Sequence, residues 1–429
     1  MSADTANKSQ EETPAVENAA DESPKGRAGT GLTGVLRRLG LILFGLLFAW
    51  LLIEVLMRVG FDYLPPSIQA DVQSVQLVPW PTGTTYGPGI ESSGEIIPHI
   101  PWVIDDVFQL RLPPGMVNFP VHWSDAKFTF NTIAPWDGYR AGFRSDPPSW
   151  PLDVVTFGDS FTFCWTKLED CWVHHLQADY DWHVFDAGSP GIGTTAEYNL
   201  MKEIAPPYKP RLIIWQWCEN DVSDDYDLAH IRHETPDLQG APQPDTPPVL
   251  QGLARYSVVD ALLSKWFNPP PRKSPYQHTQ WATLNGRFML VHTNEYPFGS
   301  SLAWPENQYG QKRNIQAHEA GEQLAASLNA RMIIVALPTK EVTYSDYLKD
   351  KLGQSYLEQI DQTRQMLLDE CKQNGWDCID PLPSFQDAVR NGQTVYYAFD
   401  SHLDASGNRI LAQLVHDYVM QNQMLPGRS

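Results

Sequence analysis

Short apolar runs alternate with helix-like stretches from residue 151 onward. The runs cover residues 152–157, 183–188, 211–217, 330–338 and, more weakly, 376–381. Strands that alternate with helices form βαβ units and a parallel sheet. These runs are continuously apolar, as expected for strands buried on both faces. The pattern predicts an α/β domain over residues 151–429, with a parallel sheet between two layers of helices.

Helical periodicity, in which apolar residues recur every three or four positions, fills the stretches between these runs. The predicted helices cover residues 171–180, 195–205, 311–329, 355–373 and 405–421. Residues 225–310 break the alternation and are rich in proline, so we expect an insertion over one edge of the domain, with a lid as one role for it. Residues 61–150 have short apolar stretches among many prolines and glycines, which predicts a membrane-proximal segment rich in strands and loops.

An apolar run of 22 residues extends from Leu39 to Gly60. As a helix it would be about 33 Å long, enough to cross the hydrocarbon core of a bilayer. We therefore predict a transmembrane helix over residues 37–60, with residues 39–60 in the membrane. Glu54 is the one acidic residue in the run, and Arg58 lies one helical turn away. Glu54 is expected to pair with Arg58. The alternative role for Glu54 is a contact with another helix.

Basic residues predict the orientation of this helix. Lys25, Arg27, Arg37 and Arg38 precede it, whereas Arg58 alone lies close to its other end. The positive-inside rule then places the N-terminus in the cytoplasm and the bulk of the chain in the periplasm or outside the cell. No small-residue cleavage site follows the run, so we expect an anchor and not a cleaved signal peptide.

Composition narrows the function classes. The net charge is −20, which argues against nucleic acid as a partner because phosphates require a basic face. Hydrophobic residues make up 42% of the chain and charged residues 19%, so a large core is possible. The first 30 residues lack any helical or strand periodicity, so we predict that residues 1–36 form a disordered cytoplasmic tail.

The five cysteines fit an oxidising compartment. Cys164 is close to Cys171 in the sequence, and Cys371 is close to Cys378. Two local disulfides and one free Cys218 are the expected arrangement. No spacing of cysteine or histidine indicates a structural zinc site, and we expect neither a metal nor a cofactor.

Four polar motifs fall at one rim of the predicted sheet, where open α/β sheets bind ligands. They are Gly158-Asp159-Ser160 after the first run, Gly188 to Gly193 after the second, Glu219-Asn220-Asp221 after the third, and Phe399-Asp400-Ser401-His402 before the last helix. Each alone is a common turn or cap. Together, in this order, they suggest a nucleophilic serine, and a helix starting at Ser160 would turn its free N–H groups toward a developing anion.

The chain resembles the SGNH (GDSL-like) hydrolase superfamily in its membrane-anchored bacterial form. The matching blocks are Gly158-Asp159-Ser160-Phe161, Asp186 to Gly191, Asn220-Asp221 and Asp400-Ser401-His402. They span about residues 151–224 and 320–423, and imply a flavodoxin-like three-layer α/β/α sandwich. Two positions depart from the pattern: Cys218 replaces a glycine, and one residue instead of two separates Asp400 from His402.

The resemblance implies a role for each motif. Ser160 would attack an ester carbonyl, while His402 would move the proton and Asp400 would hold the imidazole. The backbone N–H groups of Ser160 and Gly191 and the side-chain amide of Asn220 would form the oxyanion hole.

The expected function is therefore an extracytoplasmic esterase that cleaves O-acyl esters, with acetyl groups on a cell-envelope glycan as a candidate substrate. An O-acyltransferase using the same residues is one alternative, because both reactions share an acyl-serine. A catalytically silent envelope protein that binds or scaffolds is another. The expected partners are the acyl ester and the membrane, and the sequence does not identify a protein partner.

The orientation of the apolar helix gives a first testable prediction. A reporter enzyme that is active only outside the cytoplasm, fused after Ser429, should be active in cells, because Arg37 and Arg38 retain the N-terminus inside. A stably produced but inactive fusion would overturn the orientation and make the disulfides implausible.

Overall fold

The computed structural model describes residues 30–60, 89–90, 96–97, 102–123, 125–235, 237–238, 259, 279–293 and 301–425. By contacts the chain divides into two units, Met1–Ile53 and Glu54–Ser429. Most of the predicted disordered tail, residues 1–29, lies outside the described residues.

Helix α1 (Thr30–Val59) contains the predicted transmembrane run. Its segment Gly34–Val59, whose most apolar 18-residue stretch has a mean hydropathy of 2.5, is long and apolar enough to serve as a single-pass anchor. The helix begins seven residues before the predicted start at residue 37, so the assignment of residues 30–36 to the tail is wrong. Apolar Val35 and Leu36 continue the pattern toward the N-terminus, so the helix does not stop at the two arginines. Glu54 and Arg58 form an ion pair within α1.

Five parallel strands form the central sheet. They are β7 (Val154–Phe157), β8 (Val184–Asp186), β9 (Leu212–Trp217), β12 (Arg331–Ala336) and β13 (Cys378–Ile379). Their order in the sheet is β13-β12-β9-β7-β8, and all neighbours pair in parallel. Numbered along the chain, this is the 2-1-3-4-5 order of flavodoxin-like folds. The predicted strands and fold class are confirmed.

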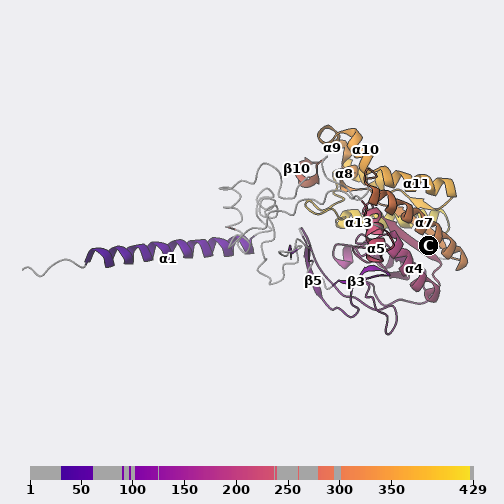
Figure 1. The fold of residues 1–429 in the computed structure, drawn as a ribbon, viewed down its shortest axis with the longest axis horizontal. Coiled ribbons are helices and arrows are strands. Elements are labelled where there is room, and N and C mark those ends of the chain that lie inside the picture. Colours follow the sequence, from indigo (N-terminus) through magenta and orange to yellow (C-terminus); the bar gives the residue numbers. More distant parts are fainter. Residues whose placement is uncertain are drawn as a thin grey trace, which may run out of the picture. The chain divides into compact units, whose positions relative to one another are not determined.

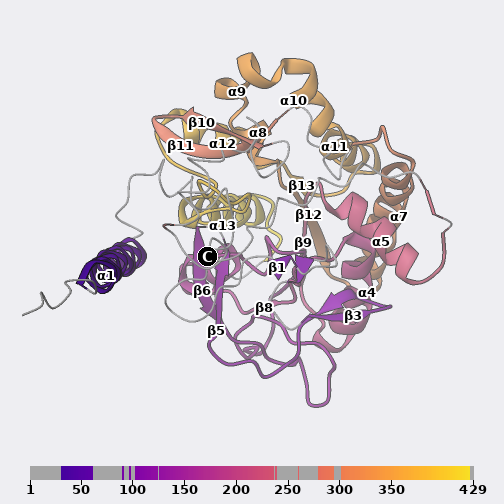
Figure 2. The same cartoon turned by 60° about the vertical axis from the view of Figure 1, so that its left-hand side comes forward.

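Helices cover both faces of this sheet, as Figures 1 and 2 show. One face packs against α4 (Thr194–Tyr208), α5 (Asp221–Ile231), α7 (Pro305–Ser327) and α11 (Gln362–Asn374). The other packs against α3 (Trp172–Ala178), α8 (Lys340–Thr343), α9 (Ser345–Leu352), α10 (Gln354–Ile360), α12 (Leu382–Arg390) and α13 (Ala405–Gln421). Side chains of β9 alternate between these cores: Ile214 enters one, and Trp215 and Ile213 enter the other. Burial of a large apolar side chain contributes about 1.5–3 kcal/mol, which explains the continuous apolar runs.

Some elements differ from those the sequence predicts. The predicted helix at 355–373 is two helices, α10 and α11, and periodicity did not predict α8, α9 or α12. Helix α5 continues to Ile231 and α7 begins at Pro305, so both enter the predicted insertion at 225–310. Within that insertion, β10 (Thr279–Leu284) and β11 (Arg287–His292) form a hairpin whose Leu284 and Met289 join the core.

Short antiparallel strands make up the described part of the segment 61–150. They are β1 (Gly89–Ile90), β2 (Ile96–Ile97), β3 (Val103–Asp105), β4 (Gln109–Arg111), β5 (Phe119–Trp123) and β6 (Ala126–Phe130). No helix occurs in the portion of this segment that the structure describes, in line with its strand-rich prediction. The β5–β6 hairpin packs in a small aromatic core with Phe163 and Trp165 of the α/β domain.

Both predicted disulfides are present, and Cys218 is free and buried. Cys164–Cys171 closes the chain between β7 and α3, with Cα atoms 5.4 Å apart. Cys371–Cys378 joins the end of α11 to β13 with a Cα separation of 6.2 Å. Each bridge spans seven residue positions along the chain.

Removal of the second bridge tests its contribution to stability. Replacement of Cys371 and Cys378 by serine should lower the free energy of unfolding by ~2–3 kcal/mol, because the unfolded chain regains the entropy of a short loop. Urea unfolding measures the change, and mass mapping of the non-reduced protein should still find Cys164–Cys171. An unchanged unfolding midpoint would contradict this.

Candidate active site

Ser160 lies in a turn directly after β7. The side-chain carboxylate of Asp159 accepts a hydrogen bond from the backbone N–H of Phe161 at 2.9 Å. The backbone carbonyl of Asp159 accepts one from the N–H of Phe163 at 3.0 Å. A side-chain bond to the backbone two residues on is the Asx-turn that Asp favours. The turn therefore presents Ser160 at the carboxyl end of the strand, as the sequence predicts.

The helix expected to start at Ser160 is absent from this described segment, which consists of turns up to the short 3₁₀ helix η2 (Leu168–Asp170). Arg144 provides the physical reason. Its buried guanidinium donates to the carbonyls of Phe163, Cys164 and Thr166, which a continuing helix would need for its own hydrogen bonds. The dipole of a long helix therefore does not act on Ser160.

Ser160, His402 and Asp400 form one chain of hydrogen bonds. Nε2 of His402 lies 2.8 Å from Oγ of Ser160, and Nδ1 lies 2.6 Å from Oδ1 of Asp400. The same carboxylate oxygen accepts the backbone N–H of His402 at 2.8 Å, so the turn itself fixes the pair. The one-residue spacing that departs from the family pattern thus still brings acid and base together.

The local charges favour Asp400 as a carboxylate and His402 as an imidazolium. Although burial alone would raise the pKa of Asp400, the charge of His402 and its ring and backbone hydrogen bonds hold that pKa below its ordinary value. Burial alone would lower the pKa of His402, but the charge and hydrogen bond of Asp400, aided by Asp159 and Glu219, raise it. Rings of Phe161 and Trp165 lie 4.9 and 5.5 Å from the imidazole and shield it on its faces.

Asn220 reaches Ser160 through Asp159. The amide of Asn220 donates to Asp159 at 3.3 Å and to Asp224 at 2.8 Å, while Oγ of Ser160 lies 3.4 Å from the same Oδ2 of Asp159. The sequence assigned no role to Asp159. The turn that Asp159 forms could have been predicted, because a short polar side chain directly before the serine favours a turn.

Glycines let the loop after β8, residues 187–193, approach the turn that carries Ser160. A Cβ on Gly188 would lie 2.4 Å from the backbone nitrogen of Phe163, so only glycine fits there. Gly191 has φ +75°, the left-handed region, and the side chain of Leu110 lies next to it. In the described residues no hydrogen bond joins Gly191 to Ser160, so its place in an oxyanion hole stays a prediction.

Cys218 occupies the space of the missing glycine. Its sulfur lies 3.0 Å from Oδ2 of Asp159 and 2.6 Å from Oδ1 of Asn220. Burial, with the nearby charges of Asp159 and Asp221, raises the pKa of the Cys218 thiol well above its ordinary value. The thiol therefore stays protonated and is not a nucleophile.

Several other acids lie behind this network, of which Glu197, Asp221 and Asp225 are buried and Glu219 and Asp224 half-buried. Burial, together with neighbouring carboxylates in most of them, raises the pKa of Glu219 and Asp225 to about 7 and of Asp224 to about 8, and also raises those of Glu197 and Asp221. One possible ligand atom each from Asp159, Cys218 and Asp221 lie within 4.8 Å of one another. The same residues are joined by hydrogen bonds: the sulfur of Cys218 lies 3.0 Å from Asp159, and the backbone N–H of Cys218 donates to Asp221 at 3.4 Å.

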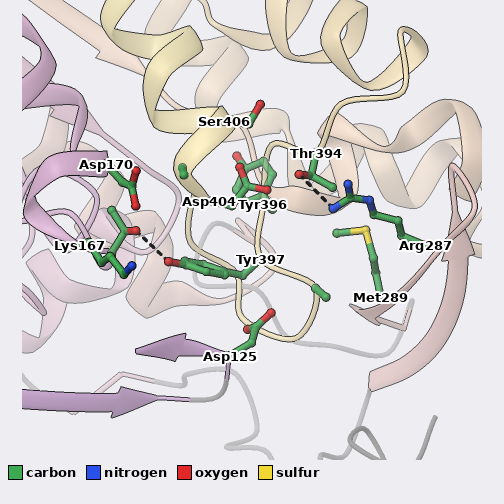
Figure 3. Close-up of a pocket in the computed structure, with 13 residues that line it drawn as sticks. Asp125, Lys167, Asp170, Arg287, Met289, Thr394, Tyr396, Tyr397, Asp404 and Ser406 are labelled. Atoms are coloured by element: carbon green, nitrogen blue, oxygen red, sulfur yellow. Dashed lines mark hydrogen bonds between the residues drawn. The ribbon is translucent and has the colours of Figure 1, made fainter. Parts of the chain in front are cut away.

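A cavity of about 560 Å³ lies beside the loop that carries Asp400 and His402. Asp125, Lys167, Arg287, Tyr397 and Asp404 are among its lining residues, and Figure 3 shows them. The hydroxyl of Tyr397 donates to Thr166 at 2.8 Å. This bond ties the acid–histidine loop to the end of the nucleophile turn.

Solved structures similar to this chain have low identity. A member of the lipolytic protein G-D-S-L family from Veillonella parvula is 12% identical, with 62% of this chain and 97% of that chain covered and a TM-score of 0.35. A catalytic mutant of an acetylxylan esterase from Geobacillus stearothermophilus is 10% identical, with 62% and 94% covered and a TM-score of 0.35. No curated protein sequence matches the chain.

A family match covers the C-terminal part of the chain. Residues 301–428 match the family described as an SGNH hydrolase-like domain, acetyltransferase AlgX. This stretch contains Asp400 and His402 but not Ser160. The resemblance to the SGNH hydrolase superfamily is confirmed.

Titration of His402 tests the electrostatic arrangement. Its pKa, measured by NMR, should lie above the ordinary 6.5, because Asp400 stabilises the imidazolium. Asp400→Asn should lower that pKa, and His402 should then become neutral at a lower pH. Ser401→Ala, at an exposed position in the same turn, is the matched control. Identical titrations in wild type and Asp400→Asn would refute the coupling.

Proposed function

We propose that this chain is a membrane-anchored serine enzyme that acts on O-acyl esters through an acyl-serine intermediate. The observation that carries the proposal is the hydrogen-bonded chain from Ser160 through His402 to Asp400, at 2.8 and 2.6 Å. Its order of nucleophile, base and buried acid is that of serine esterases and acyltransferases.

The first half of the reaction forms the acyl-enzyme. Oγ of Ser160 attacks the acyl carbonyl carbon while Nε2 of His402 takes the hydroxyl proton. Asp400 holds the Nδ1 proton and stabilises the imidazolium. When the tetrahedral intermediate collapses, the alcohol leaves with the proton from Nε2 and the acyl group remains on Ser160.

The oxyanion of this intermediate requires donors near Ser160. The N–H groups of Ser160 and Gly191 and the amide of Asn220 are the proposed set. Both amide N–H groups of Asn220 now face carboxylates, Asp159 at 3.3 Å and Asp224 at 2.8 Å. The longer bond is the weaker one, so the oxyanion would replace Asp159 as its acceptor.

The second half of the reaction decides between hydrolase and transferase. Water activated by His402 would release the acid, whereas a sugar hydroxyl in its place would take the acyl group. The family description, which names an acetyltransferase, supports O-acetyl transfer as the second candidate. It also supports acetyl as the acyl group. A cell-envelope glycan is the proposed alcohol partner.

An extracytoplasmic location completes the proposal. The apolar Gly34–Val59 segment would anchor the chain in the inner membrane, with Arg37 and Arg38 on the cytoplasmic side. Two disulfides in the remainder of the chain support an oxidising compartment for the catalytic domain.

Covalent labelling tests the nucleophile. The full-length protein in detergent, incubated with a fluorophosphonate probe, should be labelled at Ser160, and Ser160→Ala should abolish labelling. The same change should lower cleavage of p-nitrophenyl acetate by at least ~10³-fold, because the nucleophile is lost. The thermal unfolding midpoint should change little, since Ser160 is only half-buried at the rim.

Ser401→Ala is the control for labelling, because this exposed serine lies in the same site loop. Label on another residue, or no label and no cleavage in the folded wild type, would reject the enzyme. The silent envelope protein would then be the better description. With cleavage established, product analysis with and without an oligosaccharide acceptor separates hydrolysis from transfer.

A further inference from the structure

Asp125 binds the acid–histidine loop from outside the α/β domain. It immediately precedes β6, in the turn of the β5–β6 hairpin. Its carboxylate accepts the backbone N–H of Phe399 at 3.1 Å and of Asp400 at 3.0 Å. Through these bonds, a residue of the membrane-proximal segment holds the backbone of the acid that supports His402.

Lys340 holds the same loop through its carbonyl groups. The ammonium group donates to the carbonyl of Ala398 at 3.0 Å and to that of Asp400 at 3.1 Å. Burial lowers the pKa of Lys340 to about 8, against the opposing effect of Glu341, Asp125 and Asp400. Asp400 is therefore held at its N–H by an anion and at its carbonyl by a cation.

The same hairpin also contacts the nucleophile turn. Phe130 packs edge-on against Phe163 at 5.1 Å, and Phe128 against Trp165 at 5.6 Å. Trp165 in turn stacks on His402 at 5.5 Å. One hairpin thus supports both segments whose side chains form the Ser160–His402–Asp400 chain.

We propose that Asp125 is a positioning residue, which fixes the carboxylate of Asp400 against His402 by holding the backbone of residues 399 and 400. Its effect on catalysis rests on the proposed function. Figure 3 shows Asp125 from the hairpin turn facing the loop that follows Tyr397. The contact between Asp400 and His402 is 2.6 Å long, so a displacement of about 1 Å would disrupt it, and misplacements of that size can cost ~10²-fold in rate.

A carboxylate at this position has an energetic cost. Burial, followed by the charge of Asp400, raises the pKa of Asp125 above its ordinary value. If Asp125 only stabilised the turn, a neutral side chain could accept the same backbone N–H groups without placing a second carboxylate near Asp400. The cost is offset by two charge-assisted bonds to the backbone of the loop.

Three variants in the full-length protein in detergent test this role. Asp125→Ala removes the acceptor, and Asp125→Asn keeps one acceptor oxygen without charge. Asp137→Asn, at an exposed position of the same segment, is the matched control. The measurements are kcat and KM for p-nitrophenyl acetate, the pKa of His402 by NMR, and the thermal unfolding midpoint.

Asp125→Ala should lower kcat by ~10–100-fold with little change in KM, because the chemistry and not substrate binding is disturbed. The pKa of His402 should fall toward its ordinary value as the contact with Asp400 loosens. Asp125→Asn should recover part of both losses, and Asp137→Asn should match the wild type.

Unchanged kcat and an unchanged His402 titration in folded Asp125→Ala would overturn the proposal. If that variant does not fold, wild-type kcat and His402 titration in Asp125→Asn would do so. An unlabelled and inactive wild type would reject the proposed function instead. The fall in the pKa of His402 on Asp125→Ala would then still test the positioning.

Discussion

The contact between the Asp400 carboxylate and the imidazole of His402 is the interaction on which the candidate site depends. Asp400 is almost fully buried, and a buried carboxylate is stable only when charges and N–H groups surround it. His402 supplies its ring and its backbone N–H, and Asp125 and Lys340 hold the backbone of Asp400. Since the carboxylate raises the pKa of His402, the same contact sets the pH range in which the imidazole can accept a proton.

The described part of the segment 61–150 packs into the α/β domain. Arg144 bonds the carbonyl groups that would continue a helix after Ser160, and Ser160 lies on a turn. Burial lowers the pKa of Arg144 to about 10, so it stays charged at neutral pH. Phe128 and Phe163 lie 4.8 and 5.4 Å from this guanidinium and surround it with aromatic rings. The segment predicted from the sequence as rich in strands and loops therefore shapes both halves of the candidate site.

Cys218, which stands where the SGNH pattern has a glycine, belongs to the network of acids behind Ser160. Cys218 lies between Asp159 and Asn220, and its protonated thiol can give one hydrogen to either oxygen. Glycine would leave these oxygens without that donor. Burial raises the pKa of Asp224 to about 8 and that of Glu219 to about 7, so these acids retain protons near neutral pH. Asn220, whose amide bonds two of these carboxylates, connects the network to the proposed oxyanion site.

The sequence by itself predicted the sheet and the apolar helix. It offered the two disulfide pairs as the cysteines nearest to each other, and with the resemblance to SGNH hydrolases it identified Ser160, Asn220, Asp400 and His402 as candidate residues. These follow from local signals, since strands buried on both faces are apolar throughout, and the motifs fall at strand ends. Helices α8, α9 and α12 were not predicted, because they are short and packing in the folded chain decides which of their positions are apolar. Only the tertiary structure decided that Ser160 begins a turn and that Asp125 and Arg144 serve the site. Each of these contacts joins residues far apart in the chain, and a periodic pattern contains no information about which distant backbone groups a side chain will meet.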